Sequence, residues 1–234
     1  MAEIGYGYGS EFQLLRFLGH HRIEFESIIS KNSRFKENLK WLDFPYENHR
    51  ISMDGEFKGI TFLKDRADYP MLQRKWESFW PQKGNSQNWD AVFVHKDEYV
   101  LIEAKAHMNE VRTNSNATNK ESIRLIQNAF ILTKEQFEIK STNDWSKKYY
   151  QLANRLAFLK FMIDNNIKAH LLNIYFLNGY TKRSYENRKT ILEDKNVLSQ
   201  IEWQKTINKQ YEYLGIKESE IKNYITSIFV NCKK

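Results

Sequence analysis

One predicted β-hairpin constrains the fold of this 234-residue chain more than any other stretch. Two apolar runs rich in β-branched and aromatic residues, 89–95 and 99–105, flank a short polar turn. If the tight loop is Lys96-Asp97, counting back along both strands places Asp90 directly opposite Glu103. Directly opposed residues of antiparallel strands have Cβ atoms about 5 Å apart, so two carboxylates meet on an otherwise apolar sheet.

Lys105 shares the face of Asp90 and Glu103, so an ammonium group joins the two carboxylates. Two buried like charges disfavour each other's ionisation, and a divalent cation removes that cost. Mg²⁺ is held by one or two carboxylates together with waters and phosphate oxygens, and a nearby lysine can orient an attacking water. The alternative interpretation is a structural ion pair between Lys105 and one of the carboxylates near a strand end.

The spacing of these residues resembles a known nuclease motif. Asp90, twelve further residues and then Glu103-Ala104-Lys105 resemble the core of the PD-(D/E)XK nuclease superfamily, which has the restriction-endonuclease-like fold. Asn88-Trp89 stands where many members carry a proline before the aspartate. Over about residues 5–180 the chain resembles a largely uncharacterised branch of the superfamily, through Trp80-Pro81, Gly84, Trp89-Asp90-Ala91, Glu103-Ala104-Lys105-Ala106-His107 and Tyr150-Gln151-Leu152-Ala153-Asn154-Arg155-Leu156-Ala157.

This resemblance implies both a fold and a chemistry. The implied fold is α/β, a restriction-endonuclease-like mixed central β-sheet flanked by helices on both sides. The implied activity is that of a nuclease in which Asp90 and Glu103 bind Mg²⁺ or Mn²⁺, the Ala104 carbonyl completes the inner shell and Lys105 assists the attacking water. We expect a single nuclease-like domain over 1–234, with a C-terminal helix and strand extension at about 180–234.

The first predicted helix carries a further candidate metal ligand, Glu11. An amphipathic run begins at this residue, and Ser10 precedes it as a predicted N-cap. In the superfamily a glutamate on the first helix often joins the metal site, which implies the same role for Glu11. The alternative is that Glu11 stands in the first helical turn because the helix dipole stabilises a carboxylate there.

A second group of candidates lies on the helix predicted at about 145–165. Gln151 and Arg155 are four residues apart and therefore share one helix face. Many nucleases of the superfamily use a Gln or Arg on this helix to contact the substrate phosphate or to orient a metal ligand; an ordinary solvated face is the alternative. His107 follows Lys105 at the same parity, and it is either a phosphate contact at the mouth of the site or an ordinary residue at the sheet edge.

Apolar periodicity and turn signals predict alternating helices and strands along the chain. A second hairpin is predicted around Asp54-Gly55, with strands at 49–53 and 60–63, and residues 106–118 are predicted to form a surface loop. The other expected elements are strands at 169–177 and 224–230 and helices at about 10–30, 33–42, 70–80, 120–139, 145–165 and 197–213, the last ending at Gly215. Helices on both sides of a mixed sheet define an α/β domain.

Charge and hydropathy limit the classes of protein to which the chain can belong. Lys and Arg number 36 against 29 Asp and Glu, and this formal charge of +7 favours polyanionic partners such as nucleic acid. No apolar stretch reaches the ~20 residues that span a bilayer, and the N-terminus lacks a signal-peptide pattern. A single cysteine, Cys232, excludes an intrachain disulfide. We therefore expect a cytoplasmic protein without a membrane partner.

The function expected from these patterns is a metal-dependent phosphodiesterase that hydrolyses nucleic acid, with DNA as the expected substrate. The alternative is a catalytically silent nucleic-acid-binding or protein-binding module on the same fold, as part of a defence or repair system. The intact acidic pair with Lys105 favours the enzyme, because a binding module has little need of mutually repelling carboxylates. A homodimer is expected by analogy with nucleases of this fold.

Overall fold

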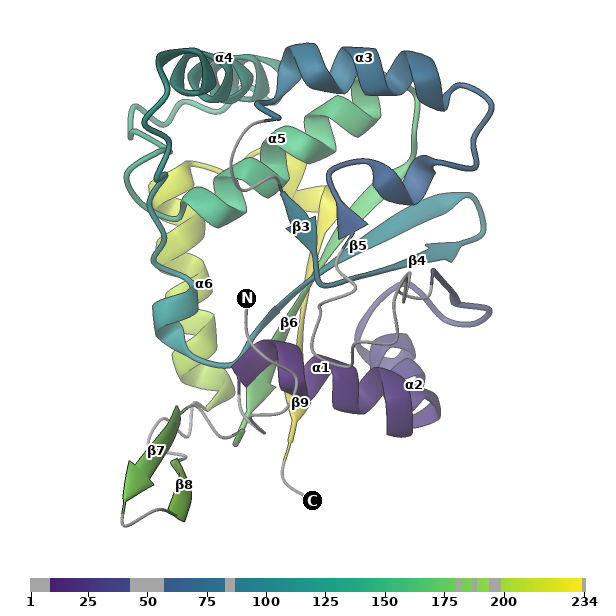
Figure 1. Ribbon diagram of the computed structural model, residues 1–234, viewed down its shortest axis with the longest axis vertical. Helices are drawn as coiled ribbons and strands as arrows, with labels where there is room; N and C mark the ends of the chain where they lie inside the picture. Colours follow the sequence, from purple (N-terminus) through teal and green to yellow (C-terminus); the bar gives the residue numbers. More distant parts are fainter. Residues whose placement is uncertain are drawn as a thin grey trace.

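A computed structural model describes residues 9–42, 57–82, 87–179, 182–186, 189–193 and 199–232. At its centre lies a five-stranded mixed sheet in the order β1-β4-β5-β6-β9 (Figure 1). β1, β4 and β5 are antiparallel neighbours, whereas β6 and β9 run parallel to β5. The strands span Lys40–Leu42 (β1), Ala91–His95 (β4), Glu98–Lys105 (β5), Ala169–Leu177 (β6) and Ile225–Asn231 (β9).

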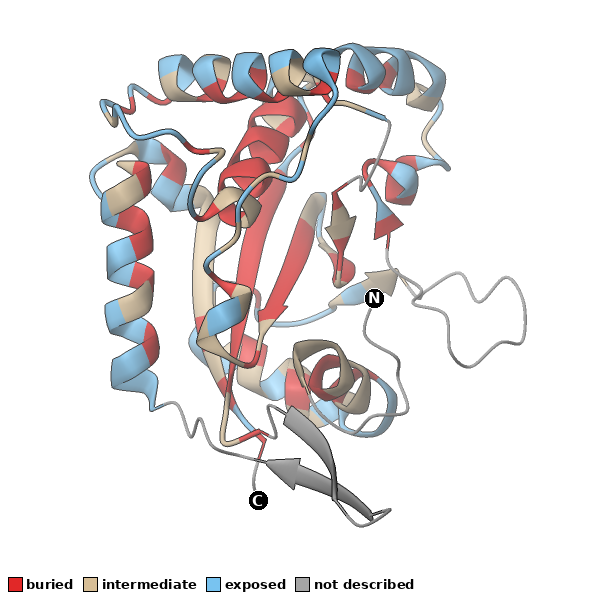
Figure 2. Ribbon diagram, turned by 60° about the vertical axis from the view of Figure 1, so that its left-hand side comes forward, coloured by how far each residue is buried: buried red, intermediate tan, exposed pale blue. Residues whose placement is uncertain are grey.

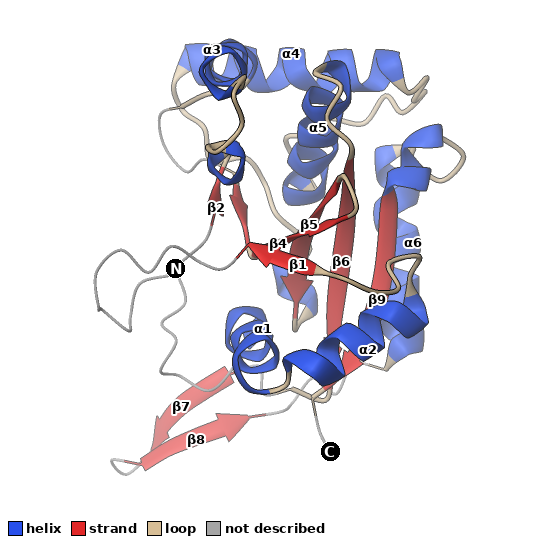
Figure 3. Ribbon diagram, turned by 90° about the vertical axis from the view of Figure 1, so that its right-hand side faces the viewer, coloured by secondary structure: helices blue, strands red, loops and turns tan. Residues whose placement is uncertain are grey.

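Six α-helices occur in the described residues, and they cover both faces of this sheet (Figure 3). α1 and α2 pack on one face, where Phe17 joins Phe93 and Ile174 in an apolar cluster. α5 and α6 lie on the other face, and α3 and α4 pack around α5 through contacts such as that between the Trp76 and Phe158 rings. The expected mixed α/β class is confirmed, with helices at Gly9–His20 (α1), Arg22–Asn32 (α2), Tyr69–Phe79 (α3), Lys120–Gln136 (α4), Tyr150–Asp164 (α5) and Gln200–Leu214 (α6).

α5 is the central helix of the molecule. All of residues 152–162 are buried (Figure 2), including the polar Asn154, Arg155 and Lys160. A helix that is apolar on most sides lies inside a domain, because each of those sides must be covered. Buried polar side chains on such a helix need hydrogen-bond partners, and Arg155 finds its main partner on β5.

The β4–β5 hairpin has the predicted register. Ala91 pairs with Ile102, and Lys96 in the tight turn adopts a φ of 59°. Asp90 lies one residue before β4, and its N–H donates to the Ile102 carbonyl at 3.2 Å. Asp90 therefore lies just beyond the last pair of the ladder, beside the segment of β5 that holds Glu103.

Most of the other predicted elements are confirmed, with ends that shift by a few residues. The central strand predicted at 169–177 is β6, and the strand predicted at 224–230 is β9. α6 begins with a capping box between Ser199 and Glu202 and ends at Gly215, whose φ is 73°. The helix predicted from 145 begins only at Tyr150, because Tyr149 adopts a left-handed φ of 58°.

Of the two helices predicted near the start of the chain, one is divided in two and the other is wrong. In place of one helix at 10–30 there are two, α1 and α2, which change direction at His21. The bend follows Gly19, a residue type common at sharp helix bends. The helix predicted at 33–42 does not form, because Asn38 adopts a left-handed φ of 56° and residues 40–42 pair with β4 instead.

The second predicted hairpin is wrong in the arm that the structure describes. Residues 61–63 form a 3₁₀ turn, η2 (Thr61–Leu63), in which the Leu63 N–H donates to the Ile60 carbonyl at 2.9 Å. Phe62 and Leu63 are both buried, so these apolar side chains find cover without a strand. The other arm, at 49–53, and its turn lie outside the described residues.

Two short ladders and two further 3₁₀ turns complete the description. The predicted loop at 106–118 contains the first of these turns and is otherwise without helix or strand. No helix in the described part of the chain is long and apolar enough to cross a membrane. The short elements are β2 (Phe57–Lys58) paired with β3 (Asn88–Trp89), β7 (Lys182–Glu186) paired with β8 (Lys189–Glu193), η3 (Met108–Glu110) and η4 (Glu220–Tyr224).

Candidate functional site

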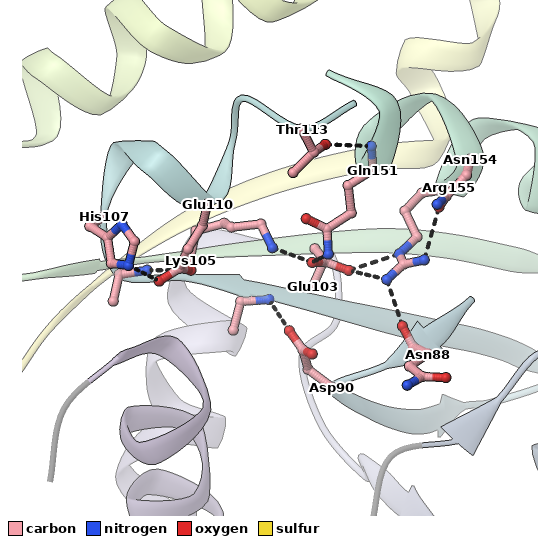
Figure 4. A network of polar contacts seen from close by, with 12 residues as sticks. Asn88, Asp90, Glu103, Lys105, His107, Glu110, Thr113, Gln151, Asn154 and Arg155 are labelled. Atoms are coloured by element: carbon pink, nitrogen blue, oxygen red, sulfur yellow. Dashed lines mark hydrogen bonds and ion pairs between the residues drawn. The ribbon is translucent and has the colours of Figure 1, made fainter. Parts of the chain in front are cut away.

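Glu103 on β5 is the centre of a buried polar cluster (Figure 4). The residue is only 4% exposed, and its side chain points toward α5. Gln151 Nε2 donates to Glu103 Oε1 at 2.7 Å, and Arg155 Nε donates to Oε2 at 2.8 Å. The Lys105 ammonium also contacts Oε1. Both carboxylate oxygens are therefore bound by protein groups.

Charge compensation decides the protonation states in this cluster. Burial by itself raises the pKa of Glu103, but the charges of Arg155 and then Lys105 lower it more, so the net pKa lies below its ordinary value. Burial lowers the pKa of Lys105, and the charges of Glu103, Asp90 and Glu110 bring it above its ordinary value. The Glu103 carboxylate and the Lys105 ammonium are consequently both charged at neutral pH.

Arg155 is held in one orientation by several neighbours. Its Nη2 donates to the Asn88 carbonyl at 2.6 Å, and its Nη1 donates to Asn154 Oδ1 at 2.9 Å. The guanidinium lies over the Trp89 ring, 4.6 Å from the ring centroid. The sequence led us to expect a phosphate contact from Arg155. In the structure the side chain is buried and forms an ion pair with Glu103, which is the geometry of a positioning residue.

Asp90 lies at the end of the hairpin ladder, beside the backbone of β5. Its Oδ2 accepts a hydrogen bond from the Ala104 N–H at 2.7 Å (Figure 4). Its negative charge also raises the pKa of Lys105, so the carboxylate lies within electrostatic reach of that ammonium. The structure thus brings Asp90, Glu103, Ala104 and Lys105 together at one end of the hairpin.

The donor atoms at this end of the hairpin fit a hard divalent cation. Asp90 and Glu103 supply carboxylate oxygens, and Mg²⁺ needs only one or two of these because it keeps several waters. In the described parts of the chain, no three His, Cys, Asp or Glu side chains form a group that could hold a metal ion. Any cation bound here would rely on the two carboxylates, and Lys105 and Gln151 would have to leave Oε1 of Glu103 free for it.

Glu11 and Gln151 belong to helices on opposite faces of the sheet. Glu11 lies in the first turn of α1, which packs beside β5 on the face away from α5. Gln151 lies in the first turn of α5, where its N–H donates to Thr113 Oγ1 at 2.9 Å. The Tyr150 N–H donates to the Thr113 carbonyl at 3.0 Å, so the loop after η3 fixes the start of α5.

His107 forms a pair with Glu110 at the end of β5. His107 Nε2 lies 2.9 Å from Glu110 Oε1, and the Ala106 N–H donates to Glu110 Oε2 at 3.2 Å. The hydrogen bond that His107 donates to Glu110 raises the pKa of His107 above its ordinary value, although partial burial opposes this. Glu110 also lines the pocket beside Glu103, a role that sequence reasoning missed.

A small pocket beside Glu103 brings in residues from the C-terminal third of the chain. Its space suffices for about one water molecule. Asn173 on β6 pairs in register with Glu103. Because it is a polar residue in a mostly apolar strand, it was a signal that sequence reasoning could have used. No such signal marks Gln210 on α6. The pocket is lined by Glu103, Lys105, Gln151, Asn173, Tyr175 and Gln210, among others.

Comparisons of the chain with protein-family models, with curated proteins and with solved structures found no match.

Proposed function

We propose that this protein is a metal-dependent nuclease with a restriction-endonuclease-like fold. One observation carries the proposal: Asp90, Glu103 and Lys105, which have the spacing of that motif, meet at one end of the β4–β5 hairpin. The sheet supports the proposal, because an antiparallel β1-β4-β5 arrangement followed by parallel strands, with helices on both faces, suits the fold that the motif resemblance implies.

The proposed work is divided among the residues at the hairpin end. Asp90 and Glu103, with the Ala104 carbonyl, would hold Mg²⁺ or Mn²⁺. Glu11 would join them from the first turn of α1, which packs on the other face of the sheet from α5. The bound ion would supply charge stabilisation and a more acidic water. Lys105 would orient the attacking water or stabilise negative charge that develops on the phosphate.

Gln151, Arg155 and His107 have supporting roles in the proposal. Arg155 keeps Oε2 of Glu103 in place, because two of its nitrogens bind this oxygen. Gln151 binds the other oxygen, so its amide N–H becomes available to a substrate phosphate once Oε1 takes another ligand. His107 has a raised pKa and is partly exposed, which suits contact with an anion at the mouth of the site.

The proposed substrate is nucleic acid, with DNA as the first choice. The formal charge of +7 supports association with a polyanion. A cytoplasmic location and a homodimer that presents two sites to duplex DNA complete the proposal. The homodimer rests on analogy with nucleases of this fold.

A second candidate function is favoured because both carboxylate oxygens of Glu103 already have protein partners. Lys105, Gln151 and Arg155 together bind both oxygens of the carboxylate. In a protein that only binds nucleic acid or another protein, this cluster would serve to hold β5 and α5 together. Under this alternative the chain is a non-cleaving module of a defence or repair system.

Cleavage assays distinguish the two candidates. Purified full-length protein is incubated with supercoiled, linear and single-stranded DNA in Mg²⁺, Mn²⁺ or EDTA. We expect nicking in Mg²⁺ or Mn²⁺ that stops in EDTA, and a loss of at least about 100-fold in Glu103→Gln because one charged group at the reacting centre is lost. Asp90→Asn should show a loss of the same order.

Glu121→Gln is the matched control for these variants, because its carboxylate is 62% exposed on α4 and pairs with Arg124, outside the cluster. It should cleave at the wild-type rate. Cleavage that survives Glu103→Gln would reveal a contaminating nuclease, and an absence of cleavage in every metal would favour the non-cleaving module.

A further inference from the structure

Two buried amide side chains face the pocket beside Glu103. Asn173 on β6 is 4% exposed and Gln210 on α6 is 5% exposed, and both line the pocket. Asn173 Nδ2 and Gln210 Oε1 are fully buried atoms for which the described residues offer no hydrogen-bond partner. Buried polar atoms in native proteins are almost always satisfied, either by protein or by ordered water, so these two atoms point to an internal water.

The chemistry of the two atoms is complementary to one water molecule. Asn173 Nδ2 can only donate a hydrogen bond, and Gln210 Oε1 can only accept one. A water that accepts from Asn173 and donates one proton to Gln210 keeps a second proton for a third partner. Glu103 lines the same pocket and is the register neighbour of Asn173, so one of its oxygens can accept this proton as a third contact, beside those it already has with Lys105 and Gln151 or with Arg155.

The size of the pocket agrees with a single water. Its space suffices for about one water molecule, and buried waters typically make about three hydrogen bonds. Asn173, Gln210 and Glu103 supply that number.

We propose that one internal water bridges Asn173, Gln210 and Glu103, and that Asn173 and Gln210 are positioning residues for the Glu103 carboxylate. The presence of the water is independent of the proposed function, whereas its role in metal binding rests on it. Lys105 and Gln151 must leave Oε1 of Glu103 for a cation to bind there. The water continues to donate to the carboxylate at that moment and keeps it aimed at the hairpin end.

A crystal structure of the full chain at a resolution that shows ordered water tests the first part of the proposal. We expect a water within hydrogen-bond distance of Asn173 Nδ2, Gln210 Oε1 and a Glu103 oxygen. A dry pocket, or a direct hydrogen bond between Asn173 and Gln210, would overturn it. This result does not depend on whether the protein cleaves DNA.

Calorimetric titration with Mn²⁺ tests the second part. Gln210→Met removes the acceptor but keeps the length of the side chain, and we expect Mn²⁺ to bind about 10-fold or more weakly, as for other groups that orient metal ligands. Gln210→Glu keeps an acceptor oxygen and should restore most of the affinity. Gln204→Met, at an exposed position of the same helix, is the matched control and should bind as the wild type does.

The outcomes separate this inference from the proposed function. Equal Mn²⁺ affinity in Gln210→Met and the wild type would refute the positioning role, even if the water is seen. A wild type that binds no Mn²⁺ would overturn the proposed function together with the positioning role, while the water is still judged from the crystal. If Gln210→Met does not fold, the Mn²⁺ affinity of Asn173→Leu is compared with that of Gln210→Glu instead.

Discussion

At the scale of single residues, the molecule is organised by how it compensates one buried carboxylate. Glu103 is bound by an arginine, a lysine and an amide, and each partner comes from a different position of β5 or α5. Removing one partner of a buried ion pair leaves a charge that water cannot reach, which costs far more than losing an exposed pair. Stability and the proposed chemistry therefore depend on the same side chain.

Arg155→Met tests the energetic part of this arrangement. We expect the free energy of unfolding to fall by about 3 kcal/mol, because the Glu103 carboxylate stays buried with only Lys105 and Gln151 to compensate it. Arg124→Met is the matched control: Arg124 also contacts a glutamate, Glu121, through two nitrogens, but it is 65% exposed, so the loss should be much smaller. Urea unfolding measures both, and equal losses would contradict the prediction.

His170 predicts a specific acid sensitivity. Arg34 Nη2 donates to its Nδ1 at 3.1 Å, and its Nε2 lies 2.8 Å from Thr226 Oγ1. Burial, and then the charge of Arg34, lower the pKa of His170 from 6.5 to about 3. The neutral ring is thus favoured in the folded state, so this stabilisation is complete above about pH 6.5 and is lost as the pH falls from there toward 3.

Urea unfolding between about pH 7 and pH 5 measures this effect. Each unit of pH below the unfolded pKa costs about 1.4 kcal/mol. The wild type should therefore lose about 2 kcal/mol more than His170→Gln over this interval. Parallel curves for the two proteins would show that His170 titrates alike in the folded and unfolded states.

At the scale of helices and strands, the sequence predicted an element well where the residues at its end favour a particular turn or helix stop. The β4–β5 turn and the stop of α6 at Gly215 were predicted correctly, since each depends on a few adjacent residues. The bend at His21 and the 3₁₀ turn at 61–63 were missed, because apolar periodicity does not reveal how a helix turns to follow a sheet.

Two glycines provide opposite tests of this local chemistry. Gly215 has a φ of 73°, and a Cβ there would lie 2.6 Å from the Ser141 Cβ, so Gly215→Ala should destabilise the protein by about 2 kcal/mol or more. Gly19 lies in α1, and a Cβ there meets nothing within 4 Å, so Gly19→Ala should stabilise it by up to about 1 kcal/mol. Thermal unfolding measures both changes, and shifts of the same sign would contradict the argument.

At the scale of the whole molecule, the site depends on contacts that no short stretch of sequence encodes. The hairpin register predicted that Asp90, Glu103 and Lys105 would meet, because it follows from counting residues. The contacts of Glu103 with α5, and the position of Gln210 on α6, depend on how helices pack on the sheet. Counting residues along the sequence does not predict that packing. Arg155 is an example of what the sequence does not reveal. The helix face on which it lies was predicted, but its ion pair with Glu103 was not.

The charge of the whole chain predicts how binding to DNA should respond to salt. Glu103→Gln in EDTA should bind a DNA duplex without cutting it, and the apparent Kd should rise by about tenfold or more between about 50 and 200 mM salt, because bound cations are released from the phosphates. Fluorescence anisotropy of labelled DNA measures this. Binding that does not change with salt, or no binding, would speak against a nucleic-acid partner.

The position of β9 sets the time at which the protein can become complete during its synthesis. β9 pairs only with β6 among the described strands, and Arg16 Nη2 on α1 donates to the Cys232 carbonyl at 3.0 Å. One side of the sheet, and the contact that joins α1 to the end of β9, are therefore missing from a nascent chain until residue 232 has left the ribosome. If the chain has the proposed nuclease activity, its site would stay without this side of the sheet, and without activity toward nearby nucleic acid, until β9 has been made and has paired with β6.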